Sequence, residues 1–431
     1  MSLMINLLKS IFSNNQEIVV LGFGKEGRST YNFIRKCFPA QKLSIADTNC
    51  LLEDDEIFTD DKNIVLLLGE DYQSTLSDFD IIIKSPGVKI HDKDPKLQDK
   101  ITSQTDLFLQ CYASQTIGVT GTKGKSTTVS LIKHFLDASN CKSVLIGNIG
   151  VPAFDIIDSI DNEITIVYEL SAHQLEYLHC SPHISVLLNI FPEHLDYFDS
   201  FKDYSYAKNN IHRFQKPNDI LITNDALIEN SQQSVKVIPL SVEKQIFNIN
   251  HNPLQGSHNL YNIDSALHAV KAAGVNTEIA ISSLDSFVGL SHRLEFVGEY
   301  GGIKFINDSI STVPESTIAA IVALKDVDIL ILGGFDRGLK YDELADFLAL
   351  SNVKMFIFLG KAGARMYKLL VSSNSKSFIA KDLVDVFRII STEVDTESTC
   401  LLSPAAASYD QFNNFEHRGD MFTSLARKFS R

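Results

Sequence analysis

The stretch Gly121-Thr122-Lys123-Gly124-Lys125-Ser126-Thr127 decides the fold of this chain. A run of β-forming residues, Thr116 to Thr120, comes before it, and the apolar spacing from Ser126 to Leu136 predicts a helix after it. A glycine-rich loop between a strand and a helix lets backbone amides turn toward an anion, and the helix N-terminus adds partial positive charge. We therefore predict a phosphate-binding loop at the edge of a parallel sheet.

This loop suggests roles for three side chains and departs from the common pattern at one position. Lys125 would neutralise the charge of β- and γ-phosphates, and Ser126 or Thr127 would ligate Mg²⁺. The nucleotide-binding signature GxxxxGK[ST] requires glycine at position 119, where this chain has Val119. The strict signature therefore fails by one position, and the structural alternative is a glycine- and lysine-rich surface turn.

Short β-rich runs alternate with helical patterns along almost the whole chain, which predicts an α/β fold with parallel sheets. At roughly 150 residues per domain, the 431 residues suggest about three domains. We predict a Rossmann-like domain at 1–110, a central P-loop-type mononucleotide-binding domain at 111–290 and a second Rossmann-like domain at 291–431. The predicted strands are 17–21, 43–47, 80–83, 116–120, 164–168, 184–188, 328–332, 354–359 and 400–402.

Composition limits the function and the cellular location. The formal charge of −14 argues against a nucleic-acid partner, which would normally require a basic face. The six cysteines form no CxxC pair, so neither a disulfide framework nor a zinc site is expected. Residues 1–12 are too short for a signal peptide or a membrane span, and no stretch of about 18 apolar residues follows. We expect a cytoplasmic protein without membrane insertion.

A second glycine-rich turn lies near the start of the chain. Gly22-Phe23-Gly24-Lys25-Glu26-Gly27 follows a predicted strand, and Asp47 ends the next one. This spacing is typical of dinucleotide binding, but glycines and a helix N-terminus suit any pyrophosphate. Because a separate phosphate loop follows downstream, a UDP-linked substrate explains both turns more simply than NAD(P) does. A purely structural turn is the remaining alternative.

Carboxylate, imidazole and lysine side chains follow the central strands. Glu169 to Gln174 follow one strand, and Asn189 to Asp196, which include His194, follow another. Parallel sheets bind ligands beyond the carboxyl ends of their strands, so both segments should meet the phosphate loop. A carboxylate and an imidazole at this edge could hold Mg²⁺ against ATP phosphates. Lys208 lies on the predicted helix after Asp196. Taken alone, Lys208 is most simply interpreted as a solvated surface lysine.

In their order along the chain, these motifs resemble those of the Mur ligases, which make amide bonds with ATP. The resemblance covers essentially the whole chain and is closest to the glutamate-adding members, which share the Ser85-Pro86-Gly87 turn and the run from Ser408 to Gly419. The matching segments are Gly121 to Thr127, Gly147 to Gly150, Glu169 to Glu176, Leu188 to Asp196, Tyr204 to Lys208, Gly256 to Asn262, Ser291 to Glu295, Asn307 to Ser309 and Ser403 to Glu416.

The resemblance implies ATP, two Mg²⁺ ions, UDP-N-acetylmuramoyl-L-alanine and glutamate as ligands. Lys125, Glu169, His194 and Lys208 would be catalytic, and Lys208 would carry a carbamate derived from CO₂. The implied metal ligands are Ser126, Thr127, Glu169, His194 and the Lys208 carbamate. The implied ATP contacts are Gly121, Thr122, Lys123, Gly124, Lys125, Ser126, Thr127, Thr128, Asn259, Asn262, Arg293 and Asp308. The implied contacts with the UDP-linked substrate are Phe23, Gly24, Lys25, Asp47, Thr48, Ser85, Asn148 and Gln174.

The implied reaction has two steps. The substrate carboxylate attacks the γ-phosphorus of ATP to give an acyl phosphate and ADP, and the glutamate amine then displaces phosphate. The acyl phosphate needs protection from water, so we expect closure of the last domain through hinges near residues 110 and 291. The resemblance also implies a monomer.

The chain departs from the family pattern around the amino acid. In the segment that follows Asp308, Ile310 replaces the usual lysine and Val313 the usual asparagine, and Arg337 stands where a glutamate-binding lysine is expected. Arginine offers a planar fork to a carboxylate and is not equivalent to lysine. We expect D-glutamate, with L-glutamate as the alternative, in a pocket formed by Thr312, Arg337, Ser408 and Phe415.

Rival functions are a folylpolyglutamate synthase, an NAD(P) oxidoreductase and a UDP-sugar sensor without catalysis. The N-terminal nucleotide turn argues against the first, and the separate phosphate loop argues against the second. A pure sensor would have no need for the combination of Lys125, Glu169, His194 and Lys208.

Overall fold

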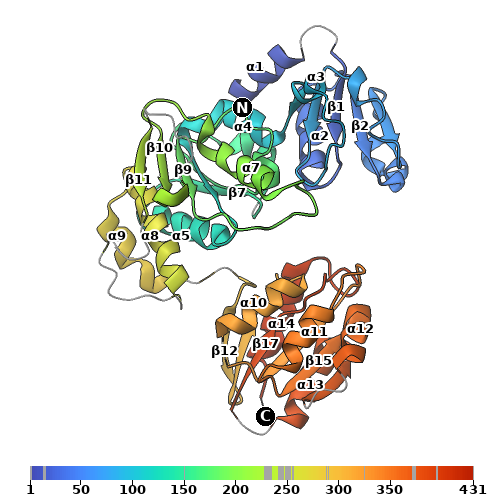
Figure 1. Cartoon of the computed structure of the whole chain (residues 1–431), viewed down its shortest axis with the longest axis vertical. Helices are drawn as coiled ribbons and strands as arrows, with labels where there is room; N and C mark the ends of the chain where they lie inside the picture. Colours follow the sequence, from blue (N-terminus) through green and yellow to red (C-terminus); the bar gives the residue numbers. More distant parts are fainter. Residues whose placement is uncertain are drawn as a thin grey trace. The chain divides into compact units, whose positions relative to one another are not determined.

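In the computed structural model of this protein, the described residues form three β-sheets, each associated with helices (Figure 1). The first two sheets lie in one compact unit, Met1–Phe287, and the third lies in a second unit, Val288–Arg431. Gly150 and Gly256 of the quoted motifs, and the predicted domain end at 290, lie outside the described residues. The structure describes residues 2–12, 16–149, 151–227, 235–240, 247, 254, 257–287, 289, 291–324, 326–370, 375–394 and 397–430.

The first sheet is fully parallel, with strand order β3-β2-β1-β4-β5. The chain reverses its direction of progress across the sheet at β1, and ligands bind parallel sheets at such a switch point. Its strands are β1 (Ile18–Leu21), β2 (Leu43–Asp47), β3 (Ile64–Leu68), β4 (Ile81–Lys84) and β5 (Ile101–Thr102). Its helices are α1 (Ser2–Ile11), α2 (Lys25–Cys37) and α3 (Pro95–Gln98), with short 3₁₀ turns at Cys50–Asp54, Glu56–Phe58 and Leu76–Asp78.

The second sheet is also parallel, in the order β11-β10-β9-β6-β8-β7. All five residues of its strand β6 are buried, as expected for a sheet covered on both faces. Its strands are β6 (Thr116–Thr120), β7 (Ser143–Gly147), β8 (Thr165–Glu169), β9 (Ile184–Leu187), β10 (Ile220–Thr223) and β11 (Lys236–Pro239). Its helices are α4 (Gln104–Tyr112), α5 (Lys125–Ala138), α6 (Ala172–Leu175), α7 (Phe201–Arg213), α8 (Ser257–Ala272) and α9 (Thr277–Ser282), with 3₁₀ turns at Ala113–Gln115, Ala153–Ser159, Asp225–Leu227 and Leu284–Ser286.

The third sheet is mixed, in the order β12-β13-β17-β14-β15-β16, because its edge strand β12 runs antiparallel to β13. The expectation of purely parallel sheets therefore needs correction at this edge, where a tight turn joins the two strands. The strands are β12 (Glu295–Tyr300), β13 (Ile303–Asn307), β14 (Ile329–Gly333), β15 (Met355–Leu359), β16 (Lys376–Ala380) and β17 (Ser398–Leu402). The helices are α10 (Pro314–Leu324), α11 (Asp342–Ala349), α12 (Gly360–Leu370), α13 (Leu383–Glu393) and α14 (Phe415–Arg427).

The predicted α/β class with several parallel sheets is confirmed, and the predicted strands fall on observed ones. The six cysteines are free thiols. No helix in the described part of the chain is long and apolar enough to cross a membrane.

Candidate active site

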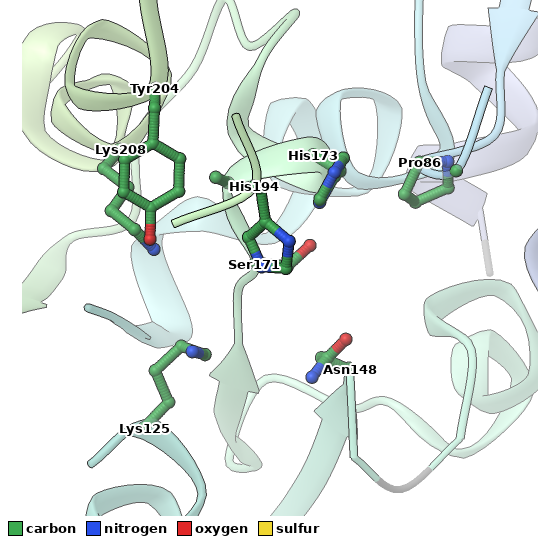
Figure 2. A pocket seen from close by; sticks show the side chains of 10 residues that line it. Pro86, Lys125, Asn148, Ser171, His173, His194, Tyr204 and Lys208 are labelled. Atoms are coloured by element: carbon green, nitrogen blue, oxygen red, sulfur yellow. The ribbon is translucent and has the colours of Figure 1, made fainter. Parts of the chain in front are cut away.

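A cavity of about 390 Å³ lies where loops from the first two sheets meet (Figure 2). These loops follow β4, β6, β7, β8 and β9 at their carboxyl ends, and α7 completes the wall. The meeting of these segments at one edge, as predicted from the strand directions, is thus observed. The cavity is lined by Pro86, Gly87, Lys125, Asn148, Ser171, Ala172, His173, His194, Tyr204 and Lys208.

The phosphate loop has the predicted position between β6 and α5. Gly124 has a φ of +90°, and a Cβ added there would lie 2.4 Å from the Asn262 side-chain oxygen, so this position requires glycine. Asn189 fixes the loop from the neighbouring strand, since its side-chain oxygen accepts from the Lys123 amide at 2.8 Å and its Nδ2 donates to the Lys123 carbonyl at 3.0 Å. Asn262 also donates to Asn259 at 3.1 Å, which brings both predicted adenine contacts beside the loop.

Two lysine amines converge on one loop carbonyl. Lys125 Nζ donates to the Gly121 carbonyl oxygen at 2.9 Å, and Lys208 Nζ donates to the same oxygen at 2.8 Å. The Lys208 side chain is only 2% exposed, and burial, followed by the positive charge of Lys125, holds its pKa well below the ordinary lysine value. The reading of Lys208 as a solvated surface lysine is therefore wrong. Two amines at one point of the wall favour an anionic ligand.

Glu169 supplies a buried carboxylate at the end of β8. The residue is fully buried, and its Oε1 accepts from Asn148 Nδ2 at 2.8 Å. Its Oε2 is buried without a hydrogen-bond partner among the described residues. A buried carboxylate oxygen without a donor is costly unless a cation sits against it. Glu169 therefore fits the metal-ligand role predicted for it.

Two histidines lie side by side in the cavity wall (Figure 2). The ring centroids of His173 and His194 are 5.0 Å apart. Burial lowers the pKa of both, and that of His173 falls to about 4. Neutral imidazoles can act as metal ligands. Within the described part of the chain, however, no three His, Cys, Asp or Glu side chains gather closely enough to hold a metal ion.

The glycine turn of the first sheet is held by side chains on its own strand ends. Asp47 accepts from the Phe23 amide at 2.6 Å and from the Asn49 amide at 2.8 Å, while Ser85 Oγ donates to the Gly22 carbonyl at 2.7 Å. The Phe23 ring is buried against Tyr31 and Phe58, so Phe23 can offer a ligand little besides its backbone. Gly24, Lys25 and Thr48 remain exposed beside it.

Residues without a predicted role, Glu26, Lys84 and Glu176, connect this turn to the cavity wall, together with the predicted Gln174. Gln174 Nε2 donates to Glu26 Oε1 at 2.6 Å, and buried Lys84 pairs with Glu176 at 3.2 Å. Tyr204, like His173, lines the cavity itself, and its hydroxyl lies 3.0 Å from that of Thr122. Lys84 lies directly before the Ser85-Pro86-Gly87 turn, and this position was its only sequence signal.

The second unit contains the predicted amino-acid residues together with Arg293 and Asp308. Asp308 is buried and accepts from Ser403 Oγ at 2.8 Å, and burial raises its pKa to about 6. Arg293, which precedes β12, is exposed to solvent. Arg337 donates to the Thr312 carbonyl at 3.0 Å, which brings these two predicted residues together.

The other two predicted pocket residues lie near a buried arginine that sequence reasoning missed. Arg418 Nε donates to Ser309 Oγ at 2.9 Å, and its Nη1 donates to the Ala407 carbonyl at 3.2 Å, directly before buried Ser408. Ser309 Oγ donates in turn to the Phe415 carbonyl at 2.8 Å.

Curated relatives match this chain over nearly its full length. The UDP-N-acetylmuramoylalanine–D-glutamate ligase of Clostridium kluyveri is 32% identical, over 96% of this chain and 97% of that protein. The ligases of the same name from Staphylococcus saprophyticus and Streptococcus thermophilus are 32% and 31% identical, over 96% and 98% of this chain and 98% and 99% of those proteins. Residues 119–252 match the family described as the Mur ligase middle domain.

Solved structures share the fold at low sequence identity. The UDP-N-acetylmuramate-alanine ligase MurC of Thermotoga maritima has a TM-score of 0.56 at 17% identity, over 96% of this chain and 99% of that one. The MurF ligase of Thermotoga maritima, solved in complex with ADP, has a TM-score of 0.55 at 18% identity, over 96% and 97% of the two chains.

The parallel sheets, the phosphate loop and the cavity lined by Lys125 and Lys208 define the class of α/β enzymes that handle nucleotide phosphates. The full-length relatives narrow this class, and the chain belongs to the Mur ligase family. Members of this family are ATP-dependent, ADP-forming enzymes that make amide bonds. The predicted family and enzyme class are confirmed.

Proposed function

We propose that this protein joins D-glutamate to UDP-N-acetylmuramoyl-L-alanine in the cytoplasm, as a step of peptidoglycan precursor synthesis. The observation that carries the proposal is the cavity in which Lys125, Lys208 and His194 face the turn that follows β4. This cavity lies at the carboxyl ends of strands from two sheets, one with a phosphate loop and one with a nucleotide-type turn. The names of the full-length relatives support the same reaction.

ATP would lie along the phosphate loop, between the N-terminus of α5 and the asparagines of α8. Lys125 and the amides from Thr122 to Thr128 would hold its phosphates, with Asn259 and Asn262 near the adenine. Gly121, Thr122, Lys123, Gly124, Ser126 and Thr127 form this loop. Arg293 and Asp308 of the second unit would complete the ATP site, and ADP in a related structure supports a nucleotide ligand.

The residues also fit Mg²⁺, which would neutralise phosphate charge when bound. Glu169 offers its unpartnered Oε2, Ser126 or Thr127 a hydroxyl, and His194 an imidazole. Since no three His, Cys, Asp or Glu side chains gather within the described residues, phosphate oxygens and a modified Lys208 would have to complete the two proposed ion sites. A carbamate on Lys208 needs a neutral amine, and burial beside Lys125 favours that form because it lowers the pKa of Lys208.

In the proposed reaction the chain holds groups in place and excludes water. The substrate carboxylate attacks the γ-phosphorus of ATP, and Lys125 with the loop amides stabilises the charge that shifts to ADP. The glutamate amine then attacks the acyl phosphate carbon, and phosphate leaves. Asn148 and Gln174 would orient the muramoyl-alanine part, and a monomer is sufficient for all these contacts.

The first sheet would be the Rossmann-like domain for the uridine nucleotide. Its strand order places the switch point at β1, directly before the glycine turn. The Phe23, Gly24 and Lys25 backbone, with Asp47, Thr48 and Ser85, would contact the uridine and the pyrophosphate. Asp47 and Ser85 already hold the turn, so they would also act by keeping its amides in place.

The third sheet would be the second Rossmann-like domain and would bind the amino acid. Arg337 is fixed by the Thr312 carbonyl and offers a bidentate fork to a glutamate carboxylate. Ser408 and Phe415 would complete the pocket. The relatives favour D-glutamate, and the arginine at this position is the observation that keeps L-glutamate as a second candidate.

The test is phosphate release from ATP, Mg²⁺ and UDP-N-acetylmuramoyl-L-alanine with D-glutamate, L-glutamate or no amino acid, with the product mass checked. We expect turnover with D-glutamate and a loss of roughly 10²–10³-fold in kcat for Lys125→Met, since one charge-stabilising donor is removed. Lys133→Met, on the same helix and paired with Asp137, is the matched control. Turnover with L-glutamate alone would reverse the proposed stereochemistry, and no product with either would overturn the proposal.

A further inference from the structure

Glu26 is a half-buried acidic residue whose carboxyl group is enclosed at the turn where the proposed function places a diphosphate. It is the second residue of α2, whose first amides point toward that turn. Gln174 Nε2 donates to its Oε1 at 2.6 Å. Its Oε2 is buried and has no hydrogen-bond partner within the described part of the chain.

The orientation of Gln174 is fixed, so the position of a proton on Glu26 can be deduced. Gln174 Oε1 accepts from the Ser171 amide at 2.9 Å, and the side-chain NH₂ must therefore face Glu26. Because Glu26 Oε1 accepts from this NH₂, a proton on the carboxyl group would sit on Oε2. An ionised Oε2 would be a buried anionic oxygen without a donor, and the proton lowers that cost because it removes the charge.

Charged groups around Glu26 only partly oppose this cost. Lys25 on α2 and Lys84 on β4 favour the ionised form, as does the hydrogen bond from Gln174 on α6, while Tyr168 on β8 also lies close enough to interact. No ion-pair partner lies within 4.0 Å of Glu26 among the described residues, and Lys84 pairs instead with Glu176. Burial has the largest effect and raises the pKa of Glu26 to about 7.

We propose that the Glu26 carboxyl group is protonated when a nucleotide diphosphate binds at the α2 N-terminus, so that nucleotide binding is coupled to proton uptake. The inference rests on the proposed function, which assigns this turn to the UDP-linked substrate. A carboxylate beside the diphosphate would repel it, whereas a neutral carboxyl group leaves the helix N-terminus and Lys25 to attract it. Glu26 thus acts as a positioning residue, through Gln174 and through the charge of the turn.

The direction of the pH effect follows from this arrangement. The free protein holds the proton below pH 7 and loses it above, and a bound diphosphate shifts the balance toward the protonated form. The affinity for a nucleotide sugar should therefore be highest below about pH 6, where Glu26 is protonated. It should fall about tenfold between pH 6 and pH 8. Glu26→Gln is neutral at every pH, so its affinity should stay flat.

The experiment is calorimetric titration of the full chain with UDP-N-acetylglucosamine, whose diphosphate diester keeps its charge over this range. Wild type, Glu26→Gln and the control Glu53→Gln, an exposed acid in the 3₁₀ turn after β2, are titrated at pH 6, 7 and 8. Wild type is also titrated at pH 7.5 in two buffers of different ionisation enthalpy. We expect wild type and Glu53→Gln to lose affinity with pH and to take up a proton, and Glu26→Gln to do neither.

Each outcome separates this inference from the function on which it rests. Binding that does not change with pH in wild type, or an equal pH slope in Glu26→Gln, would overturn the inference and leave the proposed function standing. If Glu26→Gln does not fold, the wild-type buffer comparison decides, and no proton uptake at pH 7.5 overturns the inference. Absence of nucleotide-sugar binding at every pH would overturn the proposed nucleotide site together with the inference.

Discussion

At the scale of single residues, neighbouring charges and burial set the chemistry of Lys208. Its amine donates to the Gly121 carbonyl and lies over the Tyr204 ring. Burial and the nearby Lys125 ammonium both disfavour a charged amine, so the pKa of Lys208 is lowered. A neutral amine is a nucleophile and can accept CO₂ at neutral pH.

We predict that the protein equilibrated with ¹³C-bicarbonate shows a carbamate carbon resonance from Lys208. Lys208→Arg should lose this resonance, because a guanidinium stays protonated, and should lose ligase activity with it. Lys202→Arg, an exposed lysine on the same helix, should keep both. A resonance that persists in Lys208→Arg would place the carbamate on another residue. Full activity of Lys208→Arg would show that the reaction does not need the Lys208 amine.

At the scale of secondary-structure elements, the phosphate loop depends on contacts from neighbouring strands and helices. The Asn189 side chain, after β9, hydrogen-bonds both the amide and the carbonyl of Lys123, and Asn262 on α8 packs against Gly124. Thr122 is held in the same way, since its hydroxyl accepts from the Phe191 amide at 2.9 Å. The loop is thus set in shape before any ligand binds, which favours tight positioning of phosphates.

Replacement of Gly124 by alanine should destabilise the unit that contains it by about 1–3 kcal/mol, because a positive φ strains any residue with a Cβ. The added Cβ would also lie 2.4 Å from Asn262 Oδ1. Chemical denaturation followed by far-UV circular dichroism measures the loss, since the chain has no tryptophan. Gly24→Ala is the matched control, with a φ of −70° and no atom within 4 Å of the added Cβ. Equal stability of Gly124→Ala and wild type would contradict this account.

At the scale of the whole molecule, the proposed function assigns roles to residues of each compact unit. The cavity with Lys125 and Lys208 belongs to Met1–Phe287, while Arg337 and Asp308 belong to Val288–Arg431. The proposed acyl phosphate hydrolyses in water, so the site must be closed while the acyl phosphate exists. Closure by movement of the second unit would bring these residues onto ATP and the amino acid.

Small-angle scattering tests this closure. We expect the radius of gyration to fall when a non-hydrolysable ATP analogue, Mg²⁺ and UDP-N-acetylmuramoyl-L-alanine are added together, and not with the analogue alone. An unchanged radius with all three ligands would contradict closure. The predicted hinges near residues 110 and 291 stay predictions, and the second lies close to the boundary between the two units.

Local patterns predicted strands inside the three sheets and the loops that follow them, namely β1, β2, β4, β6, β8, β9, β14, β15 and β17. The prediction was correct for the loop from Gly121 to Thr127 and for the buried strands around it. A parallel strand covered on both faces must be apolar along its whole length, and this pattern is visible in the sequence. The edge strands were missed, since half-exposed sequences such as that of β12 lack this signature, and so were β10 and β13; the missed edge strands are β3, β5, β7, β11, β12 and β16. The roles of Lys84, Glu26 and Arg418 were also missed, because no local pattern tells a buried charge from a solvated one.

The sequence by itself determined the α/β class, the phosphate loop, the family and the carboxyl-end placement of Glu169 and His194. These features depend on residue type and spacing along the chain, which the sequence records directly. Only the tertiary structure decided that Lys208 and Lys125 share one carbonyl, that the Phe23 ring faces the core and that Glu26 meets Gln174. The physical reason is that burial and hydrogen-bond partners depend on segments far apart in sequence, and these set whether a charged group keeps its charge.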